Sequence, residues 1–314
     1  GELNSGMSLM FEMMNRERLG TAMMGVGLGE VAYQNSLDWA KERRQGRDLK
    51  GPIDPKEDAD NILVHPDVRR MLLISKANNE GCRALGAWIG VLLDEMGLAE
   101  GVEKEKAESL VSLLTPVVKA HFTDVGCETV AECMQVLGGA GYIHESGIEQ
   151  FYRDVRISRI WEGTNGIQAL DLCGRKIPYK MGKSLRYLMW PMLKFIEENK
   201  EDPLMAPYTK KLYQGAKGLQ QLTLLLMSQG AGNPHFLAAG ATDYTRYFAN
   251  VVIAYLWAQI IKICLPKAEQ SDFHATKIAT ANIFFERIFP ETMALAAKIQ
   301  AGHKSLMNYP LEMM

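Results

Sequence analysis

The sequence predicts an all-α protein, and three of its features support this. Apolar residues recur at helical spacing over long stretches, of which residues 66–97 are the clearest. Alternation of polar and apolar residues, which is typical of strands, is missing from the sequence. The long stretches are separated by segments rich in glycine and proline. We therefore expect an antiparallel helical bundle over residues 1–177 and a second helical bundle over residues 185–314.

The composition indicates a globular protein and argues against two other classes, nucleic-acid-binding and membrane-spanning proteins. The 314 residues are 47% hydrophobic and 23% charged, which is ordinary for a globular protein with an ample core. The net charge of −2 and the scattered lysines and arginines argue against binding to nucleic acid. The most apolar run, Val251 to Leu265, is interrupted by Gln259 and Lys262, so we expect it to be too short and too polar for a membrane span.

The cysteines and the N-terminal residues indicate the cellular compartment in which we expect the protein. The five cysteines form no CxxC pair, so we expect reduced thiols, no metal site and a cytoplasmic protein. The first residues lack the basic start and apolar core of a signal peptide. They also lack an initiator Met, and residues 1–6 read as the middle of a longer protein.

The first bundle should contain three long helices. Residues 7–44 read as one buried helix whose glycines allow neighbouring helices to approach closely. Residues 45–65 form a long loop, which lies either over a surface or partner or in solvent. Pro66 starts a second helix, and Gly97 ends it. A third helix covers residues 103–137, in which Thr115-Pro116 marks either a kink or a fresh helix start.

Shorter elements follow. Residues 138–145 should form a tight turn, and Ser146 to Glu149 matches a capping box that opens the next helix. That helix should break at Gly163-Thr164, and a second helix should follow. Residues 178–184 read as a linker. We expect the second bundle to contain helices at 185–199, 206–229, 236–265 and 272–301, and Pro290 should kink or break the last of them.

Two motifs carry the candidate chemistry. Gln135 to Tyr142 reads QVLGGAGY, and Arg153 to Gln168 reads RDVRISRIWEGTNGIQ. In order and spacing, both strongly resemble motifs of the acyl-CoA dehydrogenases. The resemblance covers roughly residues 6–177, and the remainder looks like the extra helical domain of a bacterial branch of that family. It implies a flavin-binding bundle and an enzyme that uses FAD to dehydrogenate the Cα–Cβ bond of an acyl-CoA thioester.

Glu162 is the candidate catalytic base. It stands at a helix junction and is flanked by Ile157, Ile160 and Trp161. Apolar surroundings make a carboxylate a stronger base. The resemblance gives Glu162 the removal of the Cα proton, while the flavin accepts a hydride from Cβ. The plainer interpretation is an exposed acid at a helix end.

The resemblance also implies contacts to FAD. The residues at matching positions are Arg43, Gln45, Gln135, Gly139, Thr164 and Gly166. Arg43 and Gln45 match an R-x-Q-F-G element whose Phe is absent here, so Arg44 competes with Arg43 for the phosphate contact. A solvated arginine at a helix end is the alternative. Gly138-Gly139 would also serve as a plain helix end, and Thr164 as a plain N-cap.

Substrate and partners follow from the same resemblance. It assigns Arg18, Trp161 and Gly163 to the acyl-CoA, with Arg18 near the thioester-bearing arm. An ion pair within the helix is the alternative for Arg18. We expect electron-transfer flavoprotein as the acceptor and a homodimer or homotetramer. In that assembly, Arg43 of one subunit should meet the same FAD as Gln135 and Gly139 of another.

Two other classes of function stay open. An acyl-CoA oxidase would share every motif and differ in passing electrons to O2. A helical binding module without activity would leave Glu162 and Arg43 as surface charges. The resemblance also implies a helical domain and a β-barrel domain before residue 6. Because this chain contains neither, we expect it to fold alone but to be nearly colourless, inactive and apolar on one face.

Overall fold

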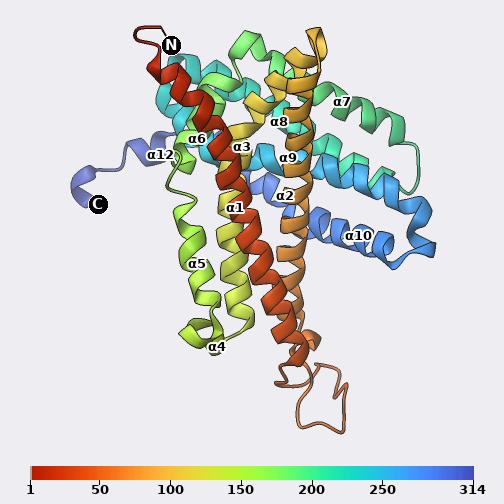
Figure 1. Cartoon of the computed structure of the whole chain (residues 1–314). Coiled ribbons are helices and arrows are strands. Elements are labelled where there is room, and N and C mark those ends of the chain that lie inside the picture. The colour runs from red at the N-terminus through yellow and green to blue at the C-terminus, as the bar shows by residue number, and fades with distance from the viewer. Residues whose placement is uncertain (1) are drawn as a thin grey trace.

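The computed structural model describes residues 2–314, apart from the side chain of Ser8, and its helical elements confirm the all-α prediction. Gly1, the first residue of the expected first bundle, lies outside the described residues. In the first half, α1 (Gly6–Glu42), α2 (Pro66–Leu98), α3 (Gly101–Val136) and the shorter α5 (Ile148–Ile157) lie side by side (Figure 1). The loop between α1 and α2 lies at the far end from the N-terminus.

The C-terminal helices lie across one side of this bundle (Figure 1). They are α7 (Lys183–Asn199), α8 (Ala206–Gly232), α9 (Pro234–Cys264), α10 (Asp272–Ile283) and α11 (Glu291–Ala301). Short α-helices are α4 (Gly139–Tyr142), α6 (Asn165–Asp171) and α12 (Lys304–Met307). The 3-10 turns are η1 (Ile62–Val64), η2 (His144–Ser146), η4 (Tyr179–Gly182), η5 (Leu265–Gln270) and η7 (Leu311–Met313). Two π-helical turns, η3 (Leu172–Lys176) and η6 (Phe284–Ile288), continue α6 and α10.

Glycines allow α1 and α3 to pack backbone to backbone, as the sequence predicts. A Cβ atom on Gly25 would lie 2.6 Å from the carbonyl oxygen of Phe122. A Cβ atom on Gly126 would lie 2.5 Å from the carbonyl oxygen of Gly25. Real Cβ atoms do not approach oxygen so closely, so each position requires glycine. This contact fixes how α1 lies against the helix that later supplies several site residues.

Some predicted boundaries are correct and others are wrong. α3 continues through Pro116, so this proline does not start a new helix. Pro290 separates η6 from α11 and does interrupt the last long helix. The predicted capping box is wrong, because Gly147 precedes α5 in a left-handed conformation, with φ of 71°. The Ser146 hydroxyl instead donates to the carbonyl oxygen of Ile143, at 3.1 Å.

The two halves share a hydrophobic core. One continuous cluster of buried apolar side chains includes Leu114 of α3, Leu172 of η3, Trp257 of α9 and Phe284 of η6. A second cluster lies between α1, α2, α3 and α5. Burial of this kind contributes about 25 cal/mol for each Å² of apolar surface removed from water. The C-terminal helices therefore stabilise the first half through direct packing against α2, α3 and α6.

α9 corrects the expectation about its apolar run. The continuous helical stretch Pro234–Gln270 is long and apolar enough to span a membrane, with a mean hydropathy of 1.8 in its most apolar window. However, 67% of that window is buried inside the bundle. Its composition is therefore explained by a central place in the core.

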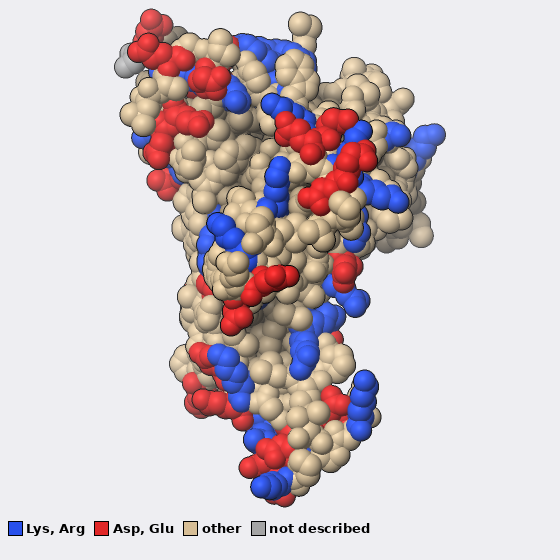
Figure 2. Space-filling model, turned by 90° about the vertical axis from the view of Figure 1, so that its right-hand side faces the viewer, with Lys and Arg blue, Asp and Glu red and all other residues tan. Residues whose placement is uncertain are grey.

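On the face drawn in Figure 2, lysines and arginines alternate with aspartates and glutamates.

Candidate active site

Glu162 lies on a tight turn between α5 and α6. Its φ of 57° and the φ of 87° at Gly163 place two consecutive residues in left-handed conformations. Such a conformation costs a residue with a side chain about 1–2 kcal/mol. The surrounding contacts must therefore hold the turn, and residues in strained backbone conformations are often found at functional sites.

Three side chains hold the two carbonyl groups of this turn. The Arg18 Nε atom of α1 donates to the Glu162 carbonyl oxygen, at 3.2 Å. The Gln168 amide nitrogen donates to the carbonyl oxygens of Glu162 and Gly163, at 3.3 and 3.2 Å. The Lys119 ammonium of α3 donates to the Gly163 carbonyl oxygen, at 2.7 Å. Because Arg18, Gln168 and Lys119 are all buried, water competes little for these bonds.

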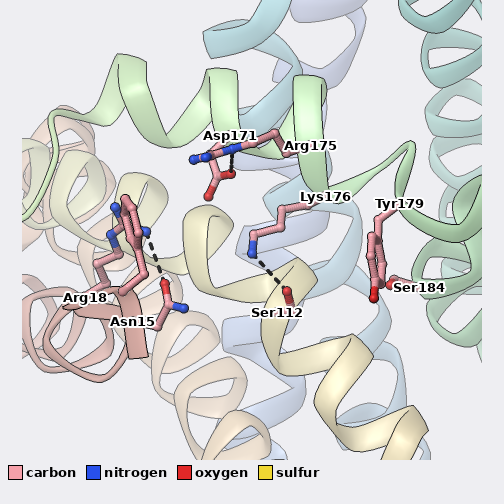
Figure 3. Close-up of a pocket in the computed structure, with 9 residues that line it drawn as sticks. Asn15, Arg18, Ser112, Asp171, Arg175, Lys176, Tyr179 and Ser184 are labelled. Carbon is pink, nitrogen blue, oxygen red and sulfur yellow. Dashed lines mark hydrogen bonds and ion pairs between the residues drawn. The ribbon is translucent and has the colours of Figure 1, made fainter. Parts of the chain in front are cut away.

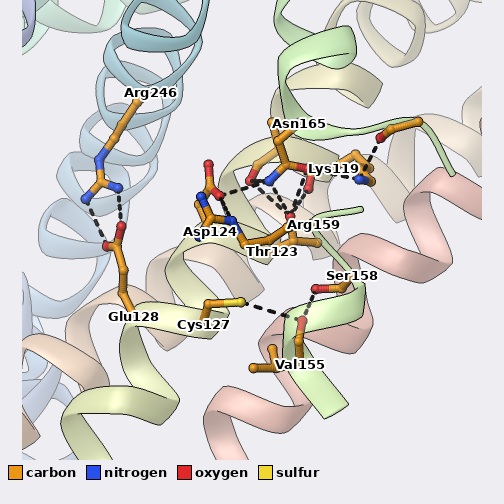
Figure 4. Close-up of polar contacts among 12 residues, drawn as sticks. Lys119, Thr123, Asp124, Cys127, Glu128, Val155, Ser158, Arg159, Asn165 and Arg246 are labelled. Carbon is orange, nitrogen blue, oxygen red and sulfur yellow. Dashed lines mark hydrogen bonds and ion pairs between the residues drawn. The ribbon is translucent and has the colours of Figure 1, made fainter. Parts of the chain in front are cut away.

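Asn165, the first residue of α6, extends this network into α3 (Figure 4). Its side-chain oxygen accepts from the Lys119 ammonium, at 2.9 Å. Its side-chain nitrogen donates to Thr123 and Asp124, at 2.9 Å in each case. Asp124 also forms an ion pair with Arg159 on the segment that precedes the turn. The α5–α6 connection is therefore bound to α3 at both of its ends.

The Glu162 side chain is only partly enclosed by this chain. Its Oε2 atom is buried and has no hydrogen-bond partner within residues 2–314. The flanking side chains of Ile157, Ile160 and Trp161 are 42%, 50% and 46% exposed. In this chain the three flanking residues do not by themselves enclose the carboxylate, and its expected apolar surroundings stay a prediction. The three residues form an exposed apolar surface beside it.

Thr164 and Gly166 lie next to this turn and are exposed. Thr164 occupies the predicted N-cap position of α6. Within the described part of the chain its side chain makes no capping hydrogen bond, so that part of the prediction is wrong. Its hydroxyl is thus available for another acceptor.

A basic cavity of about 240 Å³ lies on the other side of Arg18 (Figure 3). The π-helical turn η3 directs two consecutive residues, Arg175 and Lys176, towards it. Arg175 pairs with Asp171, at 2.7 Å, and Lys176 donates to Ser112, at 2.9 Å. Burial lowers the pKa of the Lys176 ammonium. Arg18, Arg175 and Lys176 outnumber Asp171 among the charged residues of the lining. The cavity therefore has a net positive lining that suits an anionic group.

A second cavity, of about 710 Å³, lies at the far end of the bundle. It brings together four of the residues that the resemblance assigns to FAD: Arg43, Gln45, Gln135 and Gly139. The expectation that Arg43 meets FAD from one subunit while Gln135 and Gly139 meet it from another stays a prediction, but the structure favours a different grouping. In this structure all four line a single cavity of one chain, and Trp39 and His65 line it as well.

The loop beside this second cavity is held by a buried carboxylate. Asp60 is 1% exposed and accepts from the main-chain nitrogens of Asp54, Asp48 and Ile53, at 2.9, 2.9 and 3.1 Å. These hydrogen bonds, with that from Asp54 the largest contribution, hold the pKa of the Asp60 carboxyl well below its usual range. His65 contacts the Gln45 carbonyl oxygen, at 2.7 Å. The loop therefore fixes the backbone next to Arg43.

Three residues of the site were not predicted from the sequence. The sequence indicates no role for Lys119 or Asn165, and it marks Gln168 only as the end of a motif. Lys119 carried a readable signal, because a lysine interrupts the apolar run of residues 117–122. A charged residue in such a position is buried only when it has partners.

Comparison with known proteins agrees with this fold. Residues 4–176 match the family model for the acyl-CoA dehydrogenase C-terminal domain, and residues 188–310 match the model described as acetyl-CoA dehydrogenase C-terminal like. The chain is 36% identical to 3-methylmercaptopropionyl-CoA dehydrogenase of Ruegeria pomeroyi, over 99% of this chain and 53% of that protein.

Solved structures show the same fold. The structure of ACDH-11 from Caenorhabditis elegans in complex with C11-CoA has a TM-score of 0.77 at 18% identity, over 99% of this chain and 50% of that one. The acyl-CoA dehydrogenase of Bacillus anthracis complexed with FAD has a TM-score of 0.70 at 21% identity, over 96% of this chain and 51% of that one.

These matches define a helical domain of flavin-dependent dehydrogenases. The chain belongs to the acyl-CoA dehydrogenase family. It spans about half the length of the curated relatives that it matches.

Proposed function

We propose that the protein containing this chain catalyses FAD-dependent dehydrogenation of an acyl-CoA to the trans-2-enoyl-CoA, with Glu162 as the base that removes the Cα proton. The observation that carries this proposal is the rigid turn at Glu162, whose backbone is bound by Arg18, Gln168 and Lys119. A base must be fixed to within a fraction of an ångström to act efficiently. The unpartnered Oε2 atom leaves the carboxylate free to accept a proton.

FAD, when bound, would accept the hydride that leaves Cβ. The residues that could hold it form two groups, Thr164 with Gly166 beside Glu162, and the four residues of the far cavity. Arg18 of α1 contacts the turn that carries the first group and Arg43 follows the end of α1, and the 25 residues between them span roughly 37 Å. Because one dinucleotide cannot span that length, we propose that two copies of the chain share each FAD. The protein would then be a homodimer or a homotetramer.

The basic cavity supports the choice of an acyl-CoA as substrate. Coenzyme A carries phosphate groups, and Arg18, Arg175 and Lys176 present positive charge close to the turn. We propose that this cavity receives part of the anionic arm while Trp161 and Gly163 face the acyl end. In this proposal the electron acceptor is electron-transfer flavoprotein, and the protein is cytoplasmic.

The test is Glu162→Gln in the longer protein that we propose contains this chain. Because a positioned base contributes about 10²–10⁴-fold, we expect acyl-CoA to reduce the bound flavin at least 100-fold more slowly. Flavin content and acyl-CoA affinity should stay unchanged. Glu149→Gln, at a half-buried site on α5 where the carboxylate pairs with His144, is the matched control and should leave the rate unchanged. Flavin reduction at the wild-type rate in the Glu162 variant would remove this residue from the mechanism.

A second candidate is an acyl-CoA oxidase, which would use the same residues. The two activities differ in whether O2 or a flavoprotein reoxidises the flavin. Steady turnover in air without added acceptor, with release of peroxide, would favour the oxidase. Turnover that depends on an added acceptor would favour the dehydrogenase.

A further inference from the structure

We propose that Lys119 is a positioning residue of this site, and that its buried ammonium holds the Glu162–Gly163 turn in the conformation that aims the Glu162 carboxylate. This inference rests on the proposed role of Glu162 as the base. It adds a residue on a different helix, 43 positions earlier in the chain, to the groups on which that role depends.

The burial of Lys119 is the first observation. Its side chain is 0% exposed in the middle of α3, where its neighbours Val118 and Phe122 belong to the hydrophobic core. A buried ammonium costs free energy unless it is hydrogen-bonded, so its partners must compensate. Those partners are the Gly163 carbonyl oxygen, at 2.7 Å, and the Asn165 side-chain oxygen, at 2.9 Å. Both belong to the connection that carries Glu162.

The conformation of the turn is the second observation. Glu162 and Gly163 both have positive φ, so the turn is strained and would relax if its contacts were removed. Arg18 and Gln168 bind the carbonyl group of Glu162, and Gln168 also binds that of Gly163, but the link from Gly163 to α3 is made by Lys119. Loss of this link would let the main chain rotate directly beside the carboxylate.

The charges around Lys119 are the third observation. Asp124 on α3 and Glu162 on the turn are the acidic groups that face it, and Arg18 on α1 is the basic one. Arg159 pairs with Asp124. Burial lowers the pKa of Lys119 to about 8, with Arg18 acting in the same direction and the two acids opposing it. The ammonium is therefore present at neutral pH, and its hydrogen bonds are of the stronger, charge-assisted kind.

The experiment compares Lys119→Met with Lys76→Met. Lys76 serves as the control because it is also hydrogen-bonded and only 25% of its side chain is exposed, but its partner is Glu80 on α2. Amide hydrogen exchange of the segment 159–168 is measured first, in the 314-residue chain. The Asn165 amide there donates to the Arg159 carbonyl oxygen, at 3.2 Å. We expect exchange to accelerate at least roughly tenfold in Lys119→Met alone, because a charge-assisted hydrogen bond is lost.

Steady-state kinetics of the flavin-loaded longer protein give the second measurement. Because a small displacement of a reacting group costs roughly 100-fold, we expect Lys119→Met to lower kcat by that factor and to change KM by less than about threefold. Lys119→Gln keeps an uncharged hydrogen-bond donor, so its kcat should lie between that of Lys119→Met and that of the wild type. It also serves if the methionine variant does not fold. Unchanged exchange, or faster exchange with unchanged kcat, would overturn the inference.

The outcome is separable from that of the proposed function. If Glu162→Gln keeps full activity, the proposed function fails, whereas faster exchange in Lys119→Met would still establish the link between α3 and the turn. If Glu162→Gln is inactive and Lys119→Met has wild-type kcat, the positioning role alone fails.

Discussion

The Arg18 guanidinium donates a hydrogen bond to the main-chain carbonyl of Glu162, 144 residues later in the chain. Arg18 is 6% exposed, and its guanidinium also donates to Asn15 and lies 5.6 Å from the centre of the Phe11 ring. A side chain with this many partners adopts one conformation. Arg18 thus connects the basic cavity that it lines to the turn whose carbonyl it binds, and a change at either place affects both.

Gly163→Ala should destabilise the fold and the turn. Its φ of 87° is unfavourable for a residue with a Cβ atom, and that atom would lie 2.6 Å from the Gln168 amide nitrogen. We expect a loss of about 1–2 kcal/mol in the free energy of unfolding, measured by urea denaturation. Gly20→Ala is the control, because a Cβ atom there meets nothing within 4 Å in the middle of α1. It should raise stability by up to about 1 kcal/mol, and equal effects at the two sites would contradict this account.

Arg246→Met should weaken the junction of the two halves. Arg246 of α9 binds both carboxylate oxygens of Glu128 on α3 and donates to Glu291 on α11, at 3.0 Å. Its removal leaves two carboxylates without this partner, so we expect a loss of about 1.5–3 kcal/mol in the free energy of unfolding. Arg83→Met breaks an exposed pair with Glu30 and should cost less than about 1 kcal/mol. Similar losses in the two variants would show that the junction bond is as weak as a surface pair.

His121 should make the fold sensitive to acid. It is 3% exposed, and neither ring nitrogen has a partner in the described part of the chain. Burial, reinforced by the nearby Arg246 charge, lowers the pKa of His121 to about 3. The unfolded chain, where the pKa is about 6.5, then binds more protons between these values, so stability falls as the pH is lowered from about 6.5 to about 3.

The check is the thermal midpoint as a function of pH. His121→Phe keeps a ring of similar shape and removes the titrating group, so its midpoint should fall less than that of the wild type between pH 7 and pH 4. His235→Phe changes an exposed histidine at the start of α9 and should keep the wild-type dependence. An unchanged acid dependence in His121→Phe would assign the effect to other groups.

The sequence was informative about the helices because their signals are local. Pro66 begins α2 and Pro290 interrupts the last helix, since proline restricts its own backbone and lacks an N–H donor wherever it lies. The capping box at Ser146 failed for the opposite reason. Gly147 was free to adopt positive φ, and the chain used it to turn into α5.

The site was only half predictable for a related reason. The motif identified Glu162, but the groups that hold its turn come from α1 and α3, and nothing in the spacing of the chain indicates that Lys119 reaches Gly163. α3 is buried nearly all round, so periodicity could not tell which face meets the turn. The expected separation of Arg43 from Gln135 came from the resemblance alone, whereas the cavity that they share depends on where α1 and α3 end relative to each other.

The shared FAD site gives the last prediction. If Arg43 of one copy and Glu162 of another serve the same FAD, each site takes one of these residues from each copy. Arg43→Ala and Glu162→Gln should then each inactivate the longer protein, each by damaging the half of the site that a different copy supplies. Subunits mixed by reversible dissociation should form hybrids with one site that carries both changes and one site that carries neither. Random pairing in a dimer restores about a quarter of wild-type activity, because half of the dimers are hybrids and half of their sites are intact. Activity is measured before and after mixing, and each variant alone is the control. If the mixture stays as inactive as its components while native mass spectrometry shows that hybrids have formed, both residues must act from the same copy. In that case the roughly 37 Å between Arg18 and Arg43 along α1 would have to be bridged by something other than one FAD.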